Sequence, residues 1–251
     1  MHITANSLYH DTINFLRKKK IIVCIIVLFA SSITVTLDNI LNTNSDILKI
    51  FYESKMHQYY SIFDFIKTLT LSQQKKLLFY SMMKLFSSLV GTTVLIGILE
   101  IFIKSLSFKN QILSLEFKKN IPYLFINIFI LMFIITTVVQ LGFVFLVVPG
   151  IIAFVFFSLS PIILVCDNKT IIQSIFSSFK ITFQNFKTIF PAIMLWILFK
   201  LVVLMLFLNI KIVSESFALF LLNVMINFIS AALIIYLFRF YMLFSSSRNL
   251  N

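Results

Sequence analysis

The sequence predicts an all-α fold, a polytopic bundle of transmembrane helices, and two observations carry this prediction. No charged side chain occurs between Ile121 and Cys166, a run long enough for two helical crossings because one crossing needs about 20 apolar residues. In the whole 251-residue chain 60% of the residues are apolar and only 12% are charged, about half the charged share of a typical soluble domain. A soluble core of this size would need more surface charge, so an integral membrane protein is the class that fits.

Six apolar stretches predict six spans within a single integral membrane domain, residues 1–251. The spans lie at about residues 21–37, 85–103, 121–148, 151–166, 189–208 and 217–238, with one polar segment at 38–84. The first span follows the basic run Arg17–Lys20, an order that cleaved signal peptides share. About twenty residues precede the apolar run, which is long for the basic region of a signal peptide, so the pattern favours a retained anchor over cleavage.

A helix is predicted to begin near the C-terminal end of the polar segment. Thr70 is followed three residues later by Gln73, the spacing of a capping box, which predicts a helix that begins here and continues into the second span. Within that span the small residues Ser87 and Gly91 are four apart and predict the close approach of another helix.

The second span ends in two opposite charges. Glu100 and Lys104 are four residues apart with the acid first, the favoured order for a pair on a helix surface. The sequence therefore predicts an ion pair at the membrane interface.

The dipeptide Pro149-Gly150 divides the long uncharged run. One continuous helix over residues 121–166 would be about 69 Å long at about 1.5 Å per residue, far more than a bilayer needs. Proline cannot donate a backbone hydrogen bond and glycine adopts conformations that other residues avoid. The third and fourth spans are therefore predicted to form a hairpin that turns at these two residues.

An amphipathic helix is predicted between residues 167 and 188, with Asp167 or Asn168 as its cap. Its apolar face repeats every three or four residues. The members of this face are Ile172, Phe176, Phe179, Phe183, Phe186 and Phe190. Two interpretations stay open: the helix lies in the headgroup plane of the membrane with its aromatic face in lipid, or that face packs on the other helices as ordinary core.

Charge placement predicts that both termini are cytoplasmic. The net charge of +12 comes from lysines and arginines in the connecting segments, and such residues are enriched on the cytoplasmic side. With six spans, that side would hold Arg17–Lys20, Lys104, Lys109, Lys118, Lys119, Lys169, Lys180, Lys187, Arg239 and Arg248, and the other side Lys211 and the polar segment. We expect membrane lipids, above all anionic phospholipid at the cytoplasmic face, as the partner of these cations.

A few polar residues lie inside the predicted spans. Lys200, near the middle of the fifth span, carries an insertion cost of about 2.5–3.5 kcal/mol. Trp196 is one turn earlier and within reach of a cation–π contact, and the sixth span offers Asn223 and Asn227. One interpretation makes Lys200 the centre of a polar cavity in a small-solute or lipid transporter. The other has these side chains snorkelling or hydrogen-bonded inside the bundle.

Catalytic and cofactor signatures are missing from the sequence. His2, His10 and His57 lie outside the apolar spans, so they cannot build a metal site within the membrane. There is no glycine-rich phosphate loop, no H-E-x-x-H and no G-x-S-x-G. We therefore expect a non-enzymatic membrane protein with no cofactor, no metal and no nucleic-acid partner. The transporter around Lys200 is the alternative.

Several elements resemble the YciC-like inner-membrane proteins of enterobacteria. The most specific are V-P-G-I-I at residues 148–152 and Y-L-F-R at residues 236–239. Also similar are Ile3-Thr4-Ala5 at the start, Pro161, Asp167, the segment 174–182, Trp196 and Lys200. The resemblance covers essentially the whole chain, least of all the segment between the first two spans. It implies a multi-pass protein of the bacterial inner (cytoplasmic) membrane and implies no activity, because that family is uncharacterised.

Overall fold

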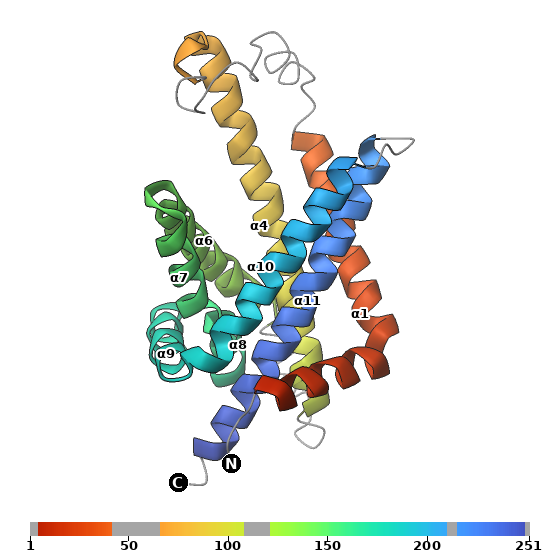
Figure 1. Ribbon diagram of the computed structural model, residues 1–251, viewed down its shortest axis with the longest axis vertical. Coiled ribbons are helices and arrows are strands. Elements are labelled where there is room, and N and C mark those ends of the chain that lie inside the picture. Colours follow the sequence, from red (N-terminus) through yellow and green to blue (C-terminus); the bar gives the residue numbers. More distant parts are fainter. Residues whose placement is uncertain (1–4, 42–65, 108–120, 210–214, 249–251) are drawn as a thin grey trace.

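A computed structural model describes residues 5–41, 66–107, 121–209 and 215–248, and within these residues the chain is helical without strands. Six candidate spans are long and apolar enough to cross a membrane. They are Ala5–Leu41, Leu71–Leu106, Ile121–Phe145, Val147–Asp167, Phe186–Phe207 and Phe217–Ser247. The predicted all-α fold with six spans is confirmed. In Figure 1 the helices form one elongated bundle, and the first turn of α1 and the last turn of α11 lie at the same end.

The first helix, α1 (Ala5–Leu41), is bent at Lys19, whose φ of −118° and ψ of 20° are not helical. We call the part before the bend, residues 5–18, the α1 arm. Figure 1 shows the arm lying across one end of the bundle while the rest of α1 runs along it. Leu8 and Thr12 of the arm are buried, whereas Tyr9 is 55% exposed, so the arm rests on the core by one side. The bend leaves the basic run at the end of the bundle.

Helix α4 (Leu71–Ser107) begins at the predicted capping box. The backbone N–H of Thr70 donates to Gln73 Oε1 at 2.9 Å, and the N–H of Gln73 donates to Thr70 Oγ1 at 3.4 Å. These two bonds satisfy donors that the first turn of a helix leaves free. The predicted helix start is confirmed.

The small residues of α4 face α1. The hydroxyl of Ser87 donates to Asp38 Oδ1 at 3.3 Å. A Cβ atom built on Gly91 would overlap the Thr34 hydroxyl oxygen, so no larger residue fits here without a shift. The close helix approach predicted from Ser87 and Gly91 is confirmed.

Helices α6 (Ile121–Phe145) and α7 (Val147–Phe157) form the predicted hairpin, but its turn is not at Pro149-Gly150. The chain reverses at Leu146, which has an extended φ of −161° and ψ of 152°. Pro149 and Gly150 lie in the first turn of α7, where proline removes no helical hydrogen bond. Gly150 is buried because it packs against α6: a Cβ atom on Gly142 would come within 2.8 Å of Gly150 Cα.

The predicted fourth span is broken into two helices. Helix α7 ends at Phe157, and α8 (Ser160–Asp167) starts with Pro161 in its first turn. Pro161 has no N–H to donate to the carbonyl of Phe157, four residues earlier, and its ring crowds that carbonyl, so the earlier helix ends there. Asn168 follows α8 in the left-handed conformation, with a φ of 53°.

Helix α9 (Ile171–Gln184) has a different cap from the one predicted. Thr170, not Asp167 or Asn168, caps it: Gln173 N–H donates to Thr170 Oγ1 at 3.4 Å, and Thr170 N–H donates to Gln173 Oε1 at 3.3 Å. Thr170 serves as the cap because its side chain and that of Gln173 each accept a hydrogen bond from the other residue's backbone N–H, as in a capping box. Helices α10 (Phe186–Asn209) and α11 (Glu215–Arg248) then complete the bundle.

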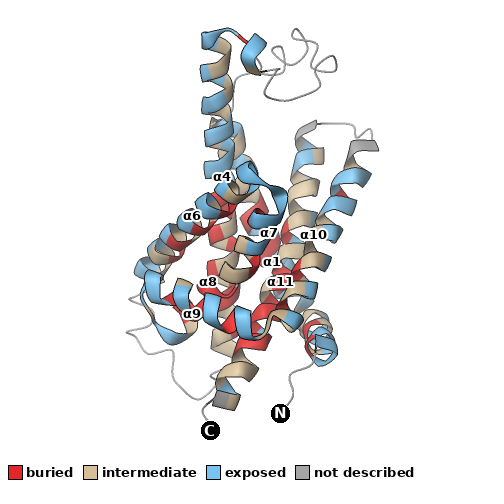
Figure 2. Cartoon of the chain, turned by 60° about the vertical axis from the view of Figure 1, so that its left-hand side comes forward, coloured by how far each residue is buried: buried red, intermediate tan, exposed pale blue. Residues whose placement is uncertain are grey.

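The core is concentrated toward one end of the bundle. Figure 2 shows buried residues mainly where α1, α4, α8 and α11 meet, while the far parts of α4, α6 and α10 are exposed or intermediate. The largest side chains with no more than 2% exposure include Phe238, Phe240, Leu8, Leu95, Leu99, Leu159, Ile162, Ile163 and Ile189. Of the predicted polar segment, residues 42–65 lie outside the described residues, as do Lys109, Lys118, Lys119 and Lys211.

Candidate functional site at the basic end of the bundle

The structure brings the predicted pair Lys200 and Trp196 together. The ammonium nitrogen of Lys200 lies 3.9 Å from the centroid of the Trp196 ring. Phe154 of α7 stacks with the same indole at 5.0 Å between centroids. The predicted cation–π contact is confirmed, and it gives the intramembrane charge a partner from its own helix.

The two asparagines of the sixth span do not converge on Lys200. Asn227 is 7% exposed and donates to Ser31 Oγ at 2.8 Å, which joins α11 to α1. Asn223 donates to the Leu219 carbonyl of its own helix at 2.9 Å. Asn227 therefore forms the predicted hydrogen bond between helices. The transport cavity around Lys200 stays a prediction.

The ion pair predicted for Glu100 and Lys104 is wrong. Glu100 is only 1% exposed, and within the described residues its Oε2 has no hydrogen-bond partner. Lys104 instead donates to the carbonyl oxygen of Val165 at 2.6 Å. The carbonyls of the last turn of a helix lack intrahelical partners, so the end of α8 offers an acceptor to this ammonium group.

Side-chain hydrogen bonds connect several helices at the end where α1 begins. The Tyr241 hydroxyl of α11 donates to Asp167 Oδ2 of α8 at 2.8 Å, and Lys169 pairs with the same oxygen at 2.9 Å. The Tyr236 hydroxyl donates to the Thr188 carbonyl of α10 at 3.1 Å. Because α11 bonds to both α8 and α10 here, the ends of these helices are fixed relative to one another.

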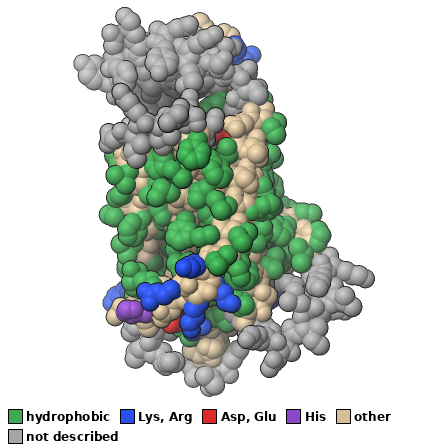
Figure 3. Space-filling model, turned by 90° about the vertical axis from the view of Figure 1, so that its right-hand side faces the viewer, with side chains coloured by type: hydrophobic (Ala, Val, Ile, Leu, Met, Phe, Trp, Pro, Cys, Tyr) green, Lys and Arg blue, Asp and Glu red, His purple; other side chains and the backbone are tan. Residues whose placement is uncertain are grey.

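We call this part of the molecule the basic end. Its described cations are Arg17, Lys18, Lys19, Lys20, Lys104, Lys169, Lys180, Lys187 and Arg239. Figure 3 shows, on the face that α1 occupies, a wide hydrophobic band with lysine and arginine gathered at its lower edge. This distribution matches a membrane-embedded band bordered by a charged surface.

Helix α9 lies at the basic end and presents three distinct faces. Its buried face consists of the hydroxyl residues Ser174, Ser178 and Thr182, each 0% exposed, together with Ile181. Its aromatic face is largely exposed, with Ile172, Phe176, Phe179 and Phe183 exposed by 67%, 71%, 46% and 68%. The rings of Phe179 and Phe183 also lie 4.6 Å and 6.4 Å from the ring of Phe156 in α7, between centroids. Its polar face carries Gln173, Lys180 and Gln184. The interpretation that the aromatic face packs as ordinary core is therefore wrong for Ile172 and Phe176. Phe179 and Phe183 are partly exposed but also pack on Phe156 of α7, and Phe186 and Phe190 lie in α10 against the core.

Hydrogen bonding explains why hydroxyl residues can face the bundle. The Ser178 hydroxyl donates to the Phe156 carbonyl at 2.6 Å, close to the break between α7 and α8. The Ser174 hydroxyl donates to the Thr170 carbonyl at 2.9 Å. Small side chains let α9 approach α7 closely, and these bonds satisfy the two serine hydroxyls. The buried Thr182 hydroxyl has no hydrogen-bond partner within the described residues. Sequence reasoning missed this face, although the spacing of Ser174, Ser178 and Thr182 by four residues was a signal for it.

The basic end places cationic and apolar side chains next to one another. It combines exposed cations with an outward aromatic helix face, the arrangement of a surface that engages lipid headgroups and acyl chains at once. Among the described residues, no three His, Cys, Asp or Glu side chains come together to hold a metal ion.

Comparison with known proteins assigns the family. The model of an uncharacterised protein family, UPF0259, matches residues 1–243. The chain belongs to the UPF0259 family. This confirms the family resemblance inferred from the V-P-G-I-I and Y-L-F-R elements, and a match of this extent includes both α9 and the basic end.

Relatives in the UPF0259 family are similar over their full length. A UPF0259 membrane protein of Buchnera aphidicola subsp. Baizongia pistaciae is 48% identical over 244 residues, which cover 97% of each chain. One of Serratia proteamaculans is 36% identical over 251 residues, covering 98% of this chain and 100% of the relative. One of Yersinia pestis is 36% identical over 248 residues, covering 97% and 96%. No solved structure matches the chain.

Proposed function

We propose that this UPF0259 protein is a non-enzymatic, multi-pass protein of the bacterial inner membrane with both termini in the cytoplasm. Its basic end engages the anionic phospholipids of the cytoplasmic leaflet. The observation that carries the proposal is the division of α9 into a bundle-facing hydroxyl face, an exposed aromatic face and a polar face.

The faces of α9 fit a helix that lies in the plane of the headgroups. Around the helix axis, the aromatic face lies next to the polar face, and both are separate from the hydroxyl face that packs on the bundle. Lipid can therefore contact Phe176 while water contacts Lys180. In water, four large apolar side chains exposed on one helix face would be costly, since each buries favourably by about 1.5–3 kcal/mol. Lipid removes this cost.

Charge asymmetry supports the orientation. The described part of the opposite end has Lys67, Lys75, Lys76 and Lys84 with Asp38, whereas the basic end has nine lysines and arginines with Asp11, Asp167 and the buried Glu100. Cations in short segments next to spans stay on the cytoplasmic side. Each lysine or arginine near an anionic leaflet contributes about 1 kcal/mol of attraction, which also favours contact between the basic end and acidic lipid.

The orientation is tested with single-cysteine variants in which Cys24 and Cys166 are replaced by serine. Lys180→Cys on α9 and Lys75→Cys on α4 are labelled with a membrane-impermeant maleimide in spheroplasts and in inverted inner-membrane vesicles. We expect Lys180→Cys to react only in inverted vesicles and Lys75→Cys only in spheroplasts. Labelling of Lys180→Cys in spheroplasts would contradict the proposed topology.

The depth of α9 is tested by fluorescence. Trp196 is the only tryptophan of the chain, so Trp196→Phe provides a background into which Phe176→Trp or Lys180→Trp places a single probe. In nanodiscs with brominated acyl chains, we expect strong quenching at position 176 and weak quenching at position 180. Equal quenching at both positions would show that the aromatic face does not enter lipid.

A further inference from the structure

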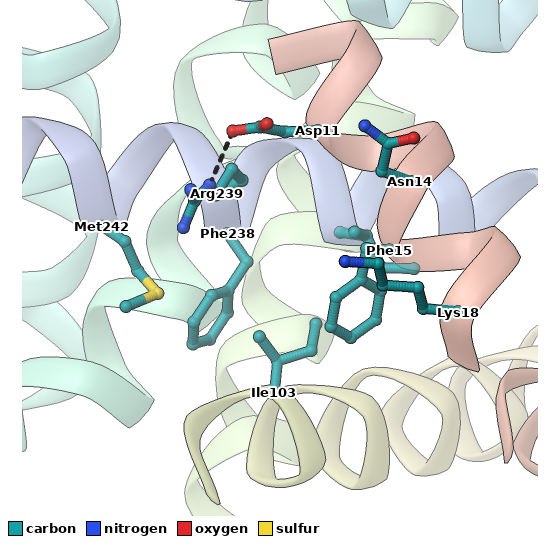
Figure 4. A pocket seen from close by; sticks show the side chains of 9 residues that line it. Asp11, Asn14, Phe15, Lys18, Ile103, Phe238, Arg239 and Met242 are labelled. Atoms are coloured by element: carbon teal, nitrogen blue, oxygen red, sulfur yellow. Dashed lines mark hydrogen bonds and ion pairs between the residues drawn. The ribbon is translucent and has the colours of Figure 1, made fainter. Parts of the chain in front are cut away.

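A pocket of about 260 Å³ opens where the α1 arm meets the ends of α4 and α11. It is lined by Asp11, Asn14, Phe15, Lys18, Ile103, Ile235, Phe238, Arg239 and Met242. Figure 4 shows these side chains arranged around a common space, with Phe15, Phe238 and Ile103 facing one another across it. Three segments far apart in the sequence therefore build one concave site.

The pocket has an apolar floor and a cationic rim. The floor is made by two phenylalanines, two isoleucines and a methionine, while Asp11, Asn14, Lys18 and Arg239 supply the polar groups. Asp11 accepts from Arg239 Nε at 2.9 Å. Within the described residues Lys18 makes no ion pair, and Figure 4 shows its ammonium group reaching over Phe15. Two cations and one anion leave the rim with an excess positive charge.

The rim lies at the depth of lipid headgroups if the bundle spans the membrane as proposed. Lys18 stands just before the apolar span that begins at Ile21, Ile103 closes the second span, and Arg239 follows directly on the sixth. A basic residue at the end of a span is the usual neighbour of lipid phosphate. Three spans thus end at the same pocket.

The composition selects among possible occupants. A small water-soluble anion would use the rim but would gain nothing from five apolar floor residues, and an uncharged acyl chain would leave the excess positive charge unpaired. An amphiphile with a negatively charged head satisfies both. The volume is below the about 300–1,000 Å³ of sites that enclose a whole drug-sized ligand, so it accommodates only part of a phospholipid.

We propose that this pocket binds one anionic phospholipid, with its phosphate between Lys18 and Arg239 and the first part of its acyl chains on the Phe15 and Phe238 side of the floor. The inference rests on the proposed function, because it requires the basic end to lie in the headgroup region. It adds a discrete site to the general attraction of the surface: the lipid is held by side chains of three helices and not only by the sum of the exposed charges.

The test is native mass spectrometry of the full-length protein released from nanodiscs that contain phosphatidylglycerol and phosphatidylcholine in equal amounts. We expect one retained phosphatidylglycerol adduct on the wild-type protein. Lys18→Ala should reduce the adduct about tenfold, while the matched control Lys180→Ala, which removes an equal charge from the exposed face of α9, should leave it unchanged. Equal losses for the two variants would overturn the site, because they would show that overall charge alone holds the lipid.

Two further variants separate the floor from the rim. Met242→Trp fills the floor without altering charge and should also abolish the adduct. Asp11→Asn removes the competing carboxylate and should strengthen retention several-fold, an outcome that a merely unfolded variant cannot produce. Circular dichroism checks that each variant keeps its helices. An adduct that survives Met242→Trp, or that excess soluble glycerophosphate removes, would overturn phospholipid binding in this pocket.

The outcomes also distinguish this inference from the proposed function. If the adduct is absent but position 176 is still quenched by brominated lipid, the discrete site is wrong and the surface orientation of the basic end stands. If position 176 is not quenched, the proposed function itself fails.

Discussion

Compared with the opposite half of the bundle, the basic end holds its helices together by hydrogen bonds between side chains and neighbouring helices. Tyr241 joins α11 to α8, Lys104 joins α4 to α8, and Ser178 joins α9 to α7. Away from the basic end, the described bonds of this kind run from Lys84 and Ser87 of α4 to Asp38 of α1 and from Asn227 of α11 to Ser31 of α1. Polar contacts between helices are therefore concentrated at one end.

Glycine contacts dominate in the other half. Gly91 admits Thr34 of α1, and Gly142 and Gly150 bring α6 and α7 into backbone contact. Small residues let helix backbones approach closely enough for dispersion to hold them in an apolar environment, where the hydrophobic effect offers no drive between helices. The comparison shows that helix packing at the basic end depends on hydrogen bonds between helices, whereas helix packing in the other half depends on glycines that let the helices approach closely.

The largest expected effect is at the hairpin. A Cβ atom on Gly142 would meet backbone atoms of Gly150 at 2.8 and 2.9 Å, and backbone cannot move aside. We expect Gly142→Ala to lower the free energy of unfolding by about 2 kcal/mol, within the usual range for overpacking. The measurement is the unfolding of the protein in mixed micelles with increasing dodecyl sulfate, followed by Trp196 fluorescence.

A second glycine provides the matched control. The three atoms nearest to a Cβ atom on Gly97 would all belong to the ring of Phe125, the closest at 2.6 Å, and the end of a side chain can shift. Alanine is also favoured over glycine in a helix by about 1 kcal/mol. Gly97→Ala should therefore be nearly neutral. Equal losses for the two variants would mean that backbone contact is not what holds the hairpin.

The next effect tests the polar end. Tyr241→Phe removes the bond to Asp167 without changing the shape of the core, and a hydrogen bond to a charged group contributes about 1.5–3 kcal/mol. Because Asp167 retains Lys169, we expect a loss near the lower limit, about 1.5 kcal/mol in the same unfolding assay. Tyr236→Phe removes a bond to the neutral Thr188 carbonyl and should cost about 1 kcal/mol or less. A reversed order would refute the role of the Asp167 carboxylate.

Much of the fold could be predicted because its signals are local. Long runs of apolar residues predict membrane spans. Thr70 and Gln73, within four consecutive positions, predict the start of a helix. The cap of α9 was equally accessible, since Thr170 and Gln173 repeat the same spacing. The turn at Leu146 could not be predicted from the sequence, because proline followed by glycine is compatible both with a reversal of the chain and with the first turn of a helix.

The candidate site was harder to predict because its contacts join distant segments. Lys104 and Val165 are 61 residues apart, and Asp11 and Arg239 are 228 apart. No local pattern indicates that Lys104 reaches the end of α8 or that the α1 arm folds across the end of α11. The contact between Lys200 and Trp196 was predictable because both residues belong to one helix turn.

The smallest effect is expected at the ion pair of the opposite half. Asp38 and Lys84 join α1 to α4, but the Lys84 side chain is 47% exposed, so solvent screens the attraction. We expect Asp38→Asn to cost about 0.5 kcal/mol, and less at 0.5 M salt, because the amide oxygen still accepts from Ser87. The unfolding assay at two salt concentrations measures both effects. A salt-independent loss as large as that of Tyr241→Phe would remove the distinction between the two ends, because polar contacts would then stabilise both of them equally.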